Sequence, residues 1–271
     1  MKALLRFVQA RLTVLVLLGG LTPCAPAASI LLVDDSEGLP IQSAWTSTLS
    51  QLGHSVTVET IAPTGNPTLA LSNYDVVIWS IGDRAYENLT AQNWSTMTQY
   101  VTGGGKLIYA GGHSVYQENW VGHAPIEAFF GVSGTLYNMP MWGSNTTITG
   151  VAGGSPFNNS TYTIVPYWAG GQYGNMFSGF NLSTGTALVN MPVVTNGAPG
   201  PYIVAQNAAG TAQLWGLDIN HVAEPDREAF LAHSLEALGV PEPSTALLFG
   251  SLTVGLLGLR RRARGVETPG T

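Results

Sequence analysis

Cysteine is almost missing from this chain of 271 residues, and its absence excludes several kinds of chemistry. The one cysteine, Cys24, lies in an amino-terminal segment that has the features of a removable leader. Without it, the rest of the chain has no thiol for a disulfide, a thiolate zinc site or a cysteine nucleophile.

Basic residues are nearly as scarce in the central part of the sequence. Between Ser29 and Gly239 the only ones are Arg84, Lys106 and Arg227, against fourteen acidic residues, which gives a formal charge of −11. Because nucleic-acid binding depends on Lys and Arg, a nucleic-acid partner is excluded. The 33 glycines indicate loop-rich surfaces.

Long apolar runs are also missing, but a short one near the amino terminus has the pattern of a signal peptide. The run 12–21 follows three basic residues, Lys2, Arg6 and Arg11. Ala25-Pro26-Ala27 then offers the small-x-small pattern that signal peptidase reads, so residues 1–28 are predicted to be a signal peptide cut near Ala27 or Ala28.

A second short apolar run lies near the carboxyl terminus, between two unusual flanks. Pro241-Glu242-Pro243 precedes the run 246–259, and four arginines follow it: Arg260, Arg261, Arg262 and Arg264. As a helix the run would be about 21 Å long, against about 30 Å for a hydrocarbon core. The arginines are expected to stay on the cytoplasmic side.

This order of a Pro-Glu-Pro turn, a short hydrophobic segment and a basic cluster resembles the PEP-CTERM sorting signal of Gram-negative bacteria, here over residues 240–264. The resemblance implies a transient contact with the inner membrane and processing by an exosortase-type enzyme. It also implies delivery to the cell surface, outer membrane or extracellular matrix. The alternative is an ordinary carboxyl-terminal membrane anchor, with 246–259 as a short transmembrane segment.

The sequence from residue 29 to residue 119 alternates between strand and helix patterns. Apolar runs predict strands at 30–33, 55–61, 74–79 and 106–110, and helical spacing predicts helices at 41–52 and 90–102. After residue 194 the sequence predicts strands at 202–205 and 212–217 and a helix at 225–238. Such alternation predicts an α/β fold with a flavodoxin-like, doubly wound parallel sheet.

The intervening region, about 120–194, is rich in Gly, Asn, Thr and aromatic residues. It is expected to be a β-rich insertion packed over the sheet. Aromatic residues in this region could stack on sugar rings, although core packing is the commoner role of such side chains. The six aromatic residues concerned are Trp120, Tyr137, Trp142, Tyr167, Trp168 and Tyr173.

Several motifs of the body resemble the class I glutamine amidotransferase-like superfamily, in particular its non-catalytic ThuA-like branch. They are Leu31-Leu32-Val33-Asp34-Asp35, the segment 74–83, Gly103-Gly104-Gly105-Lys106, and the late segments 214–218 and 225–229. The resemblance covers most of residues 29–239 apart from the insertion, and it implies the same α/β fold.

The catalytic residues of that superfamily are incompletely represented here. Its active members carry a cysteine at the turn after a strand, where this chain reads Ala-Gly-Gly-His-Ser at 110–114. His221 and Glu224 stand three residues apart, where active members show two, so glutaminase activity is not expected. The alternative is a hydrolytic set of Ser114 and His221 with Asp218 or Glu224, and His113 is a further weak candidate. Against it, Tyr116 stands where a nucleophile elbow would have glycine.

The carboxyl ends of the predicted parallel strands meet at one edge of the sheet, which we term the rim, and this is the expected ligand site. The rim candidates are Asp34, Asp35, Asp83, His113 and Asp218. Aspartates at such positions either cap helices or bind calcium through their oxygens, and no other cofactor is expected.

Two classes of function therefore remain. The first is an exported, non-enzymatic protein that binds polysaccharide, such as exopolysaccharide, or another protein. Its processing partners would be signal peptidase and an exosortase-type enzyme. The second is a hydrolase with a degenerate triad at the rim.

Overall fold

A computed structural model describes eight stretches of the chain: residues 26–62, 65–82, 89–112, 124–136, 145–153, 155–165, 179–190 and 202–243. Residues 27–242 form one compact unit, and the rest fall to a second unit of which only Pro26 and Pro243 are described. Most of the predicted signal peptide and the predicted apolar tail segment therefore lie outside the described residues. Among the residues described, no helix has the length and apolar character needed to cross a membrane.

The centre of the unit is a row of five parallel strands in the order β2-β1-β3-β4-β11. Each strand pairs in parallel with its neighbour in this row. The neighbouring parallel strands predicted at 30–33, 76–79 and 107–109 are confirmed. The strands are β1 (Ser29–Asp34), β2 (Ser55–Thr60), β3 (Val76–Gly82), β4 (Lys106–Gly111) and β11 (Ala212–Trp215).

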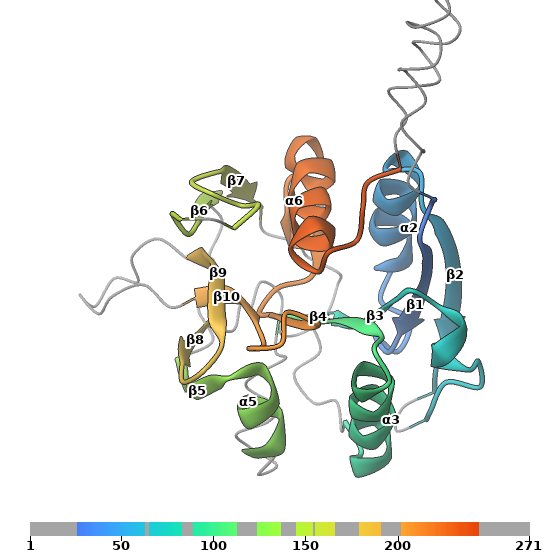
Figure 1. Cartoon of the computed structure of the whole chain (residues 1–271). Helices are drawn as coiled ribbons and strands as arrows, with labels where there is room; N and C mark the ends of the chain where they lie inside the picture. Colours follow the sequence, from blue (N-terminus) through green and yellow to red (C-terminus); the bar gives the residue numbers. More distant parts are fainter. Residues whose placement is uncertain are drawn as a thin grey trace, which may run out of the picture. The chain divides into compact units, whose positions relative to one another are not determined.

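Helices cover both faces of this row (Figure 1). On one face lie α2 (Gln42–Gln51) and α6 (Glu224–Ala237), and on the other lie α3 (Ala91–Thr102) and α5 (Ala124–Phe130). Alternate residues of β1 serve the two faces: Ile30 and Leu32 pack in the core with α2, whereas Leu31 and Val33 pack in the core with α3. Strands buried on both faces explain the continuous apolar runs of the sequence.

The start of α3 shows how the sequence sets a helix boundary. Thr90 accepts a hydrogen bond from the Asn93 backbone N–H at 3.0 Å, and the Asn93 side chain accepts one from the Thr90 N–H in return. This reciprocal capping satisfies two donors that the first helical turn leaves open. At the other end, Gly103 follows the helix, as the sequence predicts.

The β-rich region does not pack over the sheet, and that part of the prediction is wrong. The sheet continues past β11 into β10, the strand predicted at 202–205, and the strands of the β-rich region then follow in the antiparallel order β9-β6-β7, while β8 pairs with both β10 and β5. The physical reason is that β10 turns back beside β11 and offers its other edge, whose backbone groups need partners. These strands are β5 (Val132–Leu136), β6 (Thr146–Gly150), β7 (Thr161–Ile164), β8 (Gly179–Leu182), β9 (Thr186–Asn190) and β10 (Tyr202–Gln206).

Both ends of the compact unit lie at the amino ends of the parallel strands. Ser29 begins β1, and the Lys106 ammonium at the start of β4 donates a hydrogen bond to the Gly239 carbonyl at 2.7 Å. Val240 is buried, whereas Pro241 and Glu242 are exposed. The folded body therefore ends immediately before the Pro-Glu-Pro motif, at the edge of the sheet opposite the rim.

Candidate functional site

Three of the five predicted rim residues fall within the described structure, and all three are buried. Asp34 ends β1, Asp35 follows it directly, and Asp218 follows β11. Their exposed fractions are 1%, 6% and 1%. Asp83 and His113 lie outside the described residues, as does the candidate nucleophile Ser114.

The adjacent Asp34 and Asp35 do not act together, because consecutive residues of a strand point to opposite faces. The Asp34 carboxylate accepts hydrogen bonds from the N–H and hydroxyl of Ser36 and from the Gln42 amide at 2.6 Å, on the face of α2. Asp35 accepts a hydrogen bond from Trp79 Nε1 at 2.9 Å, and Trp79 packs in the core of the other face. The two carboxylates therefore serve different layers.

Neither aspartate caps α2, so that interpretation of the sequence is wrong. The residue at the cap position is Ile41, and no side chain bonds to the first turn there. Asp34 bonds instead to Ser36 in the loop and to the side chain of Gln42, the first helical residue. Its carboxylate thus fixes the path of the chain from β1 into α2.

Asp218 accepts hydrogen bonds from three separate elements at the rim. Its Oδ2 accepts hydrogen bonds from Trp45 Nε1 at 3.1 Å and from the Ser80 hydroxyl at 2.6 Å. Its Oδ1 accepts from the backbone N–H of Asn220 at 3.0 Å and from that residue's amide at 2.7 Å. One buried carboxylate thereby ties together α2, the end of β3 and the 3-10 turn η2 (Ile219–His221).

Ser80 joins this network to the end of β1. Its carbonyl accepts a hydrogen bond from the Asp35 N–H at 2.9 Å, while its hydroxyl donates to Asp218. In the sheet Ser80 stands opposite Ala110 of β4, and Ala110 stands opposite Trp215 of β11. Because an alanine side chain is short, it leaves room for Asp218 to reach across β4.

His221 is placed differently from the histidine of a hydrolytic triad. It is fully buried in η2, and its Nδ1 accepts a hydrogen bond from the backbone N–H of Asp218 at 3.3 Å. In a Ser-His-Asp triad the corresponding nitrogen donates its proton to the carboxylate. This contact makes His221 Nδ1 an acceptor, which is the role of a neutral ring that holds a turn.

Glu224 does not share this buried environment. It is exposed at the first residue of α6. Arg227, one turn later, braces the η2 turn instead: its Nε donates to the Val222 carbonyl at 2.8 Å and its guanidinium donates to the Asn220 carbonyl at 3.3 Å. The late segment is thus held by an arginine that the sequence did not single out.

The described residues contain no group of three His, Cys, Asp or Glu side chains close enough to hold a metal ion. For Asp34 and Asp35 the reason is the strand geometry, which sends the two carboxylates to opposite faces. The calcium interpretation therefore gains no support from this part of the rim.

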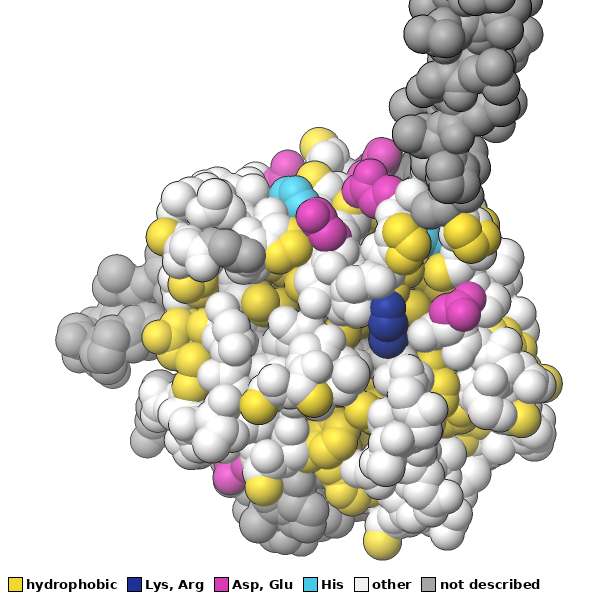
Figure 2. Space-filling view, in the orientation of Figure 1, with side chains coloured by type: hydrophobic (Ala, Val, Ile, Leu, Met, Phe, Trp, Pro, Cys, Tyr) yellow, Lys and Arg dark blue, Asp and Glu magenta, His cyan; other side chains and the backbone are white. Residues whose placement is uncertain are grey.

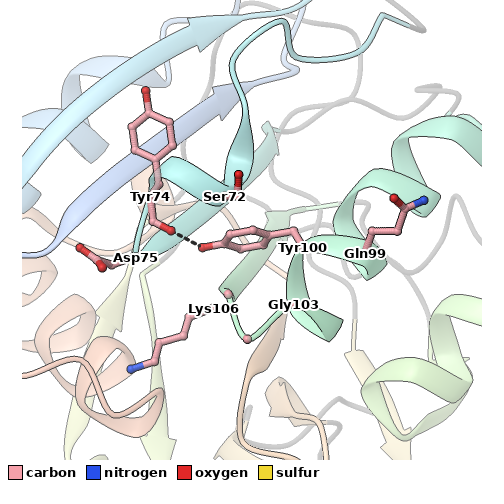
Figure 3. Close-up of a pocket in the computed structure, with 9 residues that line it drawn as sticks. Ser72, Tyr74, Asp75, Gln99, Tyr100, Gly103 and Lys106 are labelled. Atoms are coloured by element: carbon pink, nitrogen blue, oxygen red, sulfur yellow. Dashed lines mark hydrogen bonds between the residues drawn. The ribbon is translucent and has the colours of Figure 1, made fainter.

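A cavity of about 370 Å³ lies at the opposite edge of the sheet, beside the ends of the folded unit (Figure 3). Its charged residues are engaged in holding those ends. The Asp75 carboxylate accepts from the N–H and hydroxyl of Ser29, and these bonds, together with the charge of Lys106, lower the pKa of Asp75. Lys106 holds Gly239. Around them the cavity is lined by Ser72, Tyr74, Gln99, Tyr100, Gly103, Gly104 and Gly105.

Tyr100 forms a wall of this cavity. Its hydroxyl donates to the Tyr74 carbonyl at 3.1 Å, and burial raises its pKa to about 12. The ring lies against Gly105 so closely that a Cβ at position 105 would overlap it. Gly105 is therefore required by close packing, whereas a Cβ at Gly103 would make ordinary contacts at 3.4 Å.

The face shown in Figure 2 has little positive charge, and acidic side chains gather over the part where α6 lies. The helix carries Glu224, Asp226, Glu228 and Glu236.

Asp218→Asn is expected to lower the free energy of unfolding by about 2–3 kcal/mol, because one amide NH₂ would face donors that now bond to a carboxylate. Ser80→Ala removes one donor and is expected to cost about 1 kcal/mol. Urea denaturation of both variants and the parent measures these differences. An Asp218→Asn protein as stable as the parent would show that this network does not hold the fold.

Gly105→Ala is expected to lower the free energy of unfolding by about 1–3 kcal/mol, since the added methyl group must displace the Tyr100 ring. Gly103→Ala is the matched control and is expected to stay within about 0.5 kcal/mol of the parent. Thermal and urea unfolding of the pair provide the comparison. Equal effects at the two glycines would contradict the packing argument.

No protein-family model matches this chain, and no curated protein matches it. Solved structures do share its fold. A β-galactosidase from Bacillus circulans sp. alkalophilus is 12% identical with a TM-score of 0.52, covering 82% of this chain and 32% of the galactosidase. The chain thus corresponds to about one third of that enzyme's length.

Two further structures are similar to this chain. A protein from Parabacteroides merdae described as ThuA-like is 12% identical with a TM-score of 0.50, covering 79% of this chain and 90% of that one. A glutamine amidotransferase from Thermotoga maritima is also 12% identical, with a TM-score of 0.45, covering 86% and 95%. At such identities the likeness shows the fold alone: a mixed α/β unit with a largely parallel, flavodoxin-like sheet.

Proposed function

We propose that this chain is an exported, non-enzymatic protein that is sorted to the cell surface, outer membrane or extracellular matrix. In this proposal residues 1–27 or 1–28 direct export, and residues 240–264 act as a PEP-CTERM signal read by an exosortase-type enzyme. The α/β unit then binds a polysaccharide or another protein.

The observation that carries the proposal is where the folded body ends. Val240 is buried and Gly239 is held by Lys106, but Pro241 and Glu242 are exposed. The two prolines prevent the last helix from continuing into the tail. A processing enzyme can therefore reach the Pro-Glu-Pro motif without unfolding the sheet.

The two ends of the folded body and the rim lie at opposite edges of the sheet, and this arrangement also supports a role at the cell surface. Both Ser29 and Gly239 lie at the amino ends of the parallel strands, whereas Asp35 and Asp218 lie beyond their carboxyl ends. A strand rises about 3.3 Å per residue, so the six residues of β1 separate the edges by about 20 Å. A chain tethered through its ends would present its rim away from the tether.

The absence of a catalytic role is supported by the contacts of the candidate residues. Asp218 directs its carboxylate to Trp45, Ser80 and Asn220, and His221 accepts the Asp218 N–H. Glu224 is exposed on α6. In the described structure these three residues serve the turn and the helix start, and no nucleophile is among them.

The choice between polysaccharide and protein as ligand rests on the aromatic residues of the region 120–194. Flat rings with polar edges suit sugar faces. The six aromatic residues predicted for this purpose all lie outside the described residues. We place the ligand at the rim because the carboxyl ends of the parallel strands β3 and β4 lie there.

The tail is expected to be removed after sorting, because its apolar run is too short to anchor the protein permanently. Intact-mass measurement of the protein recovered from its native cell surface tests this. The expected species ends before Arg260, and a mature species that retains Arg260–Thr271 would contradict the proposal. A variant with all four tail arginines neutralised serves as the comparison and should be retained less well in the membrane as precursor.

Hydrolytic activity is expected to be absent from the exported protein. Glutaminase and esterase assays should give background rates in the parent and in Ser114→Ala and His221→Ala, with circular dichroism as the control for folding. A rate above background that both substitutions abolish in folded protein would establish the hydrolase instead.

A further inference from the structure

Ala28, at the predicted junction between signal peptide and body, is part of the folded sheet. It is 6% exposed and belongs to the core that packs under α2. Its carbonyl accepts a hydrogen bond from the Ser55 N–H at 3.1 Å, which adds one step to the pairing of β1 with β2. Its neighbour Ala27 is exposed. The boundary between body and leader thus lies between these two alanines.

The backbone nitrogen of Ala28 also has a defined partner. It donates a hydrogen bond to Nδ1 of His54 at 3.2 Å, and His54 is 6% exposed just before β2. The backbone N–H of His54 donates a hydrogen bond to the Leu49 carbonyl at 3.0 Å, which fixes His54 against the end of α2. Nδ1 of the His54 ring is therefore positioned to accept a hydrogen bond from the first residue of the folded body.

Two opposing effects act at His54, and one of them, the charge of Glu242, favours a positively charged donor there. Burial lowers the pKa of His54, which favours the neutral ring that can accept a hydrogen bond. The carboxylate of Glu242 is close enough to act in the opposite direction on that pKa. A carboxylate and a neutral imidazole are the partners that an α-ammonium group takes in proteins.

A cut between Ala28 and Ser29 would remove contacts from the folded body. Ser29 would then carry the α-ammonium, and Asp75, which already accepts the Ser29 N–H at 2.8 Å, could hold it. However, the body would lose the buried Ala28, and the Ser55 N–H would lose its acceptor. Losing a buried apolar side chain and one step of strand pairing makes this position the less favourable one.

We propose that the signal peptide is removed between Ala27 and Ala28 and that the new α-ammonium of Ala28 donates to His54 Nδ1 in the mature protein. This inference rests on the proposed export. The step is hydrolysis by signal peptidase: water adds across the amide, leaving a carboxylate on Ala27 and an ammonium on Ala28. The cut places Ala25 and Ala27 at the two small positions of the recognised pattern, whereas a cut after Ala28 would place Pro26 at the first of them.

The amino end of the sheet brings together residues from distant parts of the folded body. Ala28, His54 and Glu242 come from the start, the middle and the end of the folded body, and they meet at one place. The mature amino terminus would therefore be held beside the residue at which the Pro-Glu-Pro motif begins to leave the body.

Two matched substitutions in the full-length chain test the position of the cut. Ala27→Leu puts a large residue at the position next to the cut and is expected to reduce the processed fraction about tenfold, whereas Ala28→Leu lies beyond the cut and should leave processing within about twofold of the parent. Pulse-labelling in an exporting Gram-negative host measures processing before folding matters. Labelling of the mature α-amino group, followed by mass spectrometry, identifies the first residue.

Each result has a defined meaning. A mature parent that begins at Ala28, with processing blocked by Ala27→Leu only, supports the inference. A mature chain that begins at Ser29, or processing blocked by Ala28→Leu only, overturns the position of the cut and leaves export intact. A parent that keeps Met1 in the exporting host overturns both this inference and the proposed export.

Discussion

The structure at the rim depends on one buried carboxylate, which must be surrounded by hydrogen-bond donors. Asp218 is 1% exposed, and a charge so placed is tolerated only when donors surround it. Trp45 supplies one from α2 and Ser80 another from β3, while Asn220 supplies two from the turn that follows. Because these donors come from separate elements, satisfying Asp218 fixes how the helix, the sheet and the late turn meet.

This constraint explains why a triad-like set of residue types need not mean catalytic chemistry. Asp218, His221 and Glu224 stand close together late in the sequence, but the contacts of Asp218 and His221 brace a turn, and Glu224 is exposed. The two ends of the folded body lie at the opposite edge of the sheet, around Asp75 and Lys106. The unit thus separates the edge that carries its two ends from the edge that carries the rim.

The sequence predicts the parallel part of the fold well, because strands buried on both faces are continuous apolar runs and the helices between them are capped or ended by Thr90, Gly53 and Gly103. It does not predict that β5 to β9 extend the same sheet, since the pairs β5–β8 and β6–β9 join segments that are far apart in sequence. It locates Asp34, Asp35 and Asp218 at strand ends. It misses Ser80 and Trp45, whose only signal is a polar atom within an apolar segment, and it cannot show that Asp34 and Asp35 bond on opposite faces.

The most direct test of this account is a double-mutant cycle between α2 and the late turn. Trp45→Phe keeps an aromatic ring near Trp215 but removes the indole N–H that bonds Asp218. Unfolding free energies of the parent, Trp45→Phe, Asp218→Asn and the double variant give the coupling between the two side chains. The account predicts a coupling of about 1 kcal/mol or more, and a coupling indistinguishable from zero would contradict it.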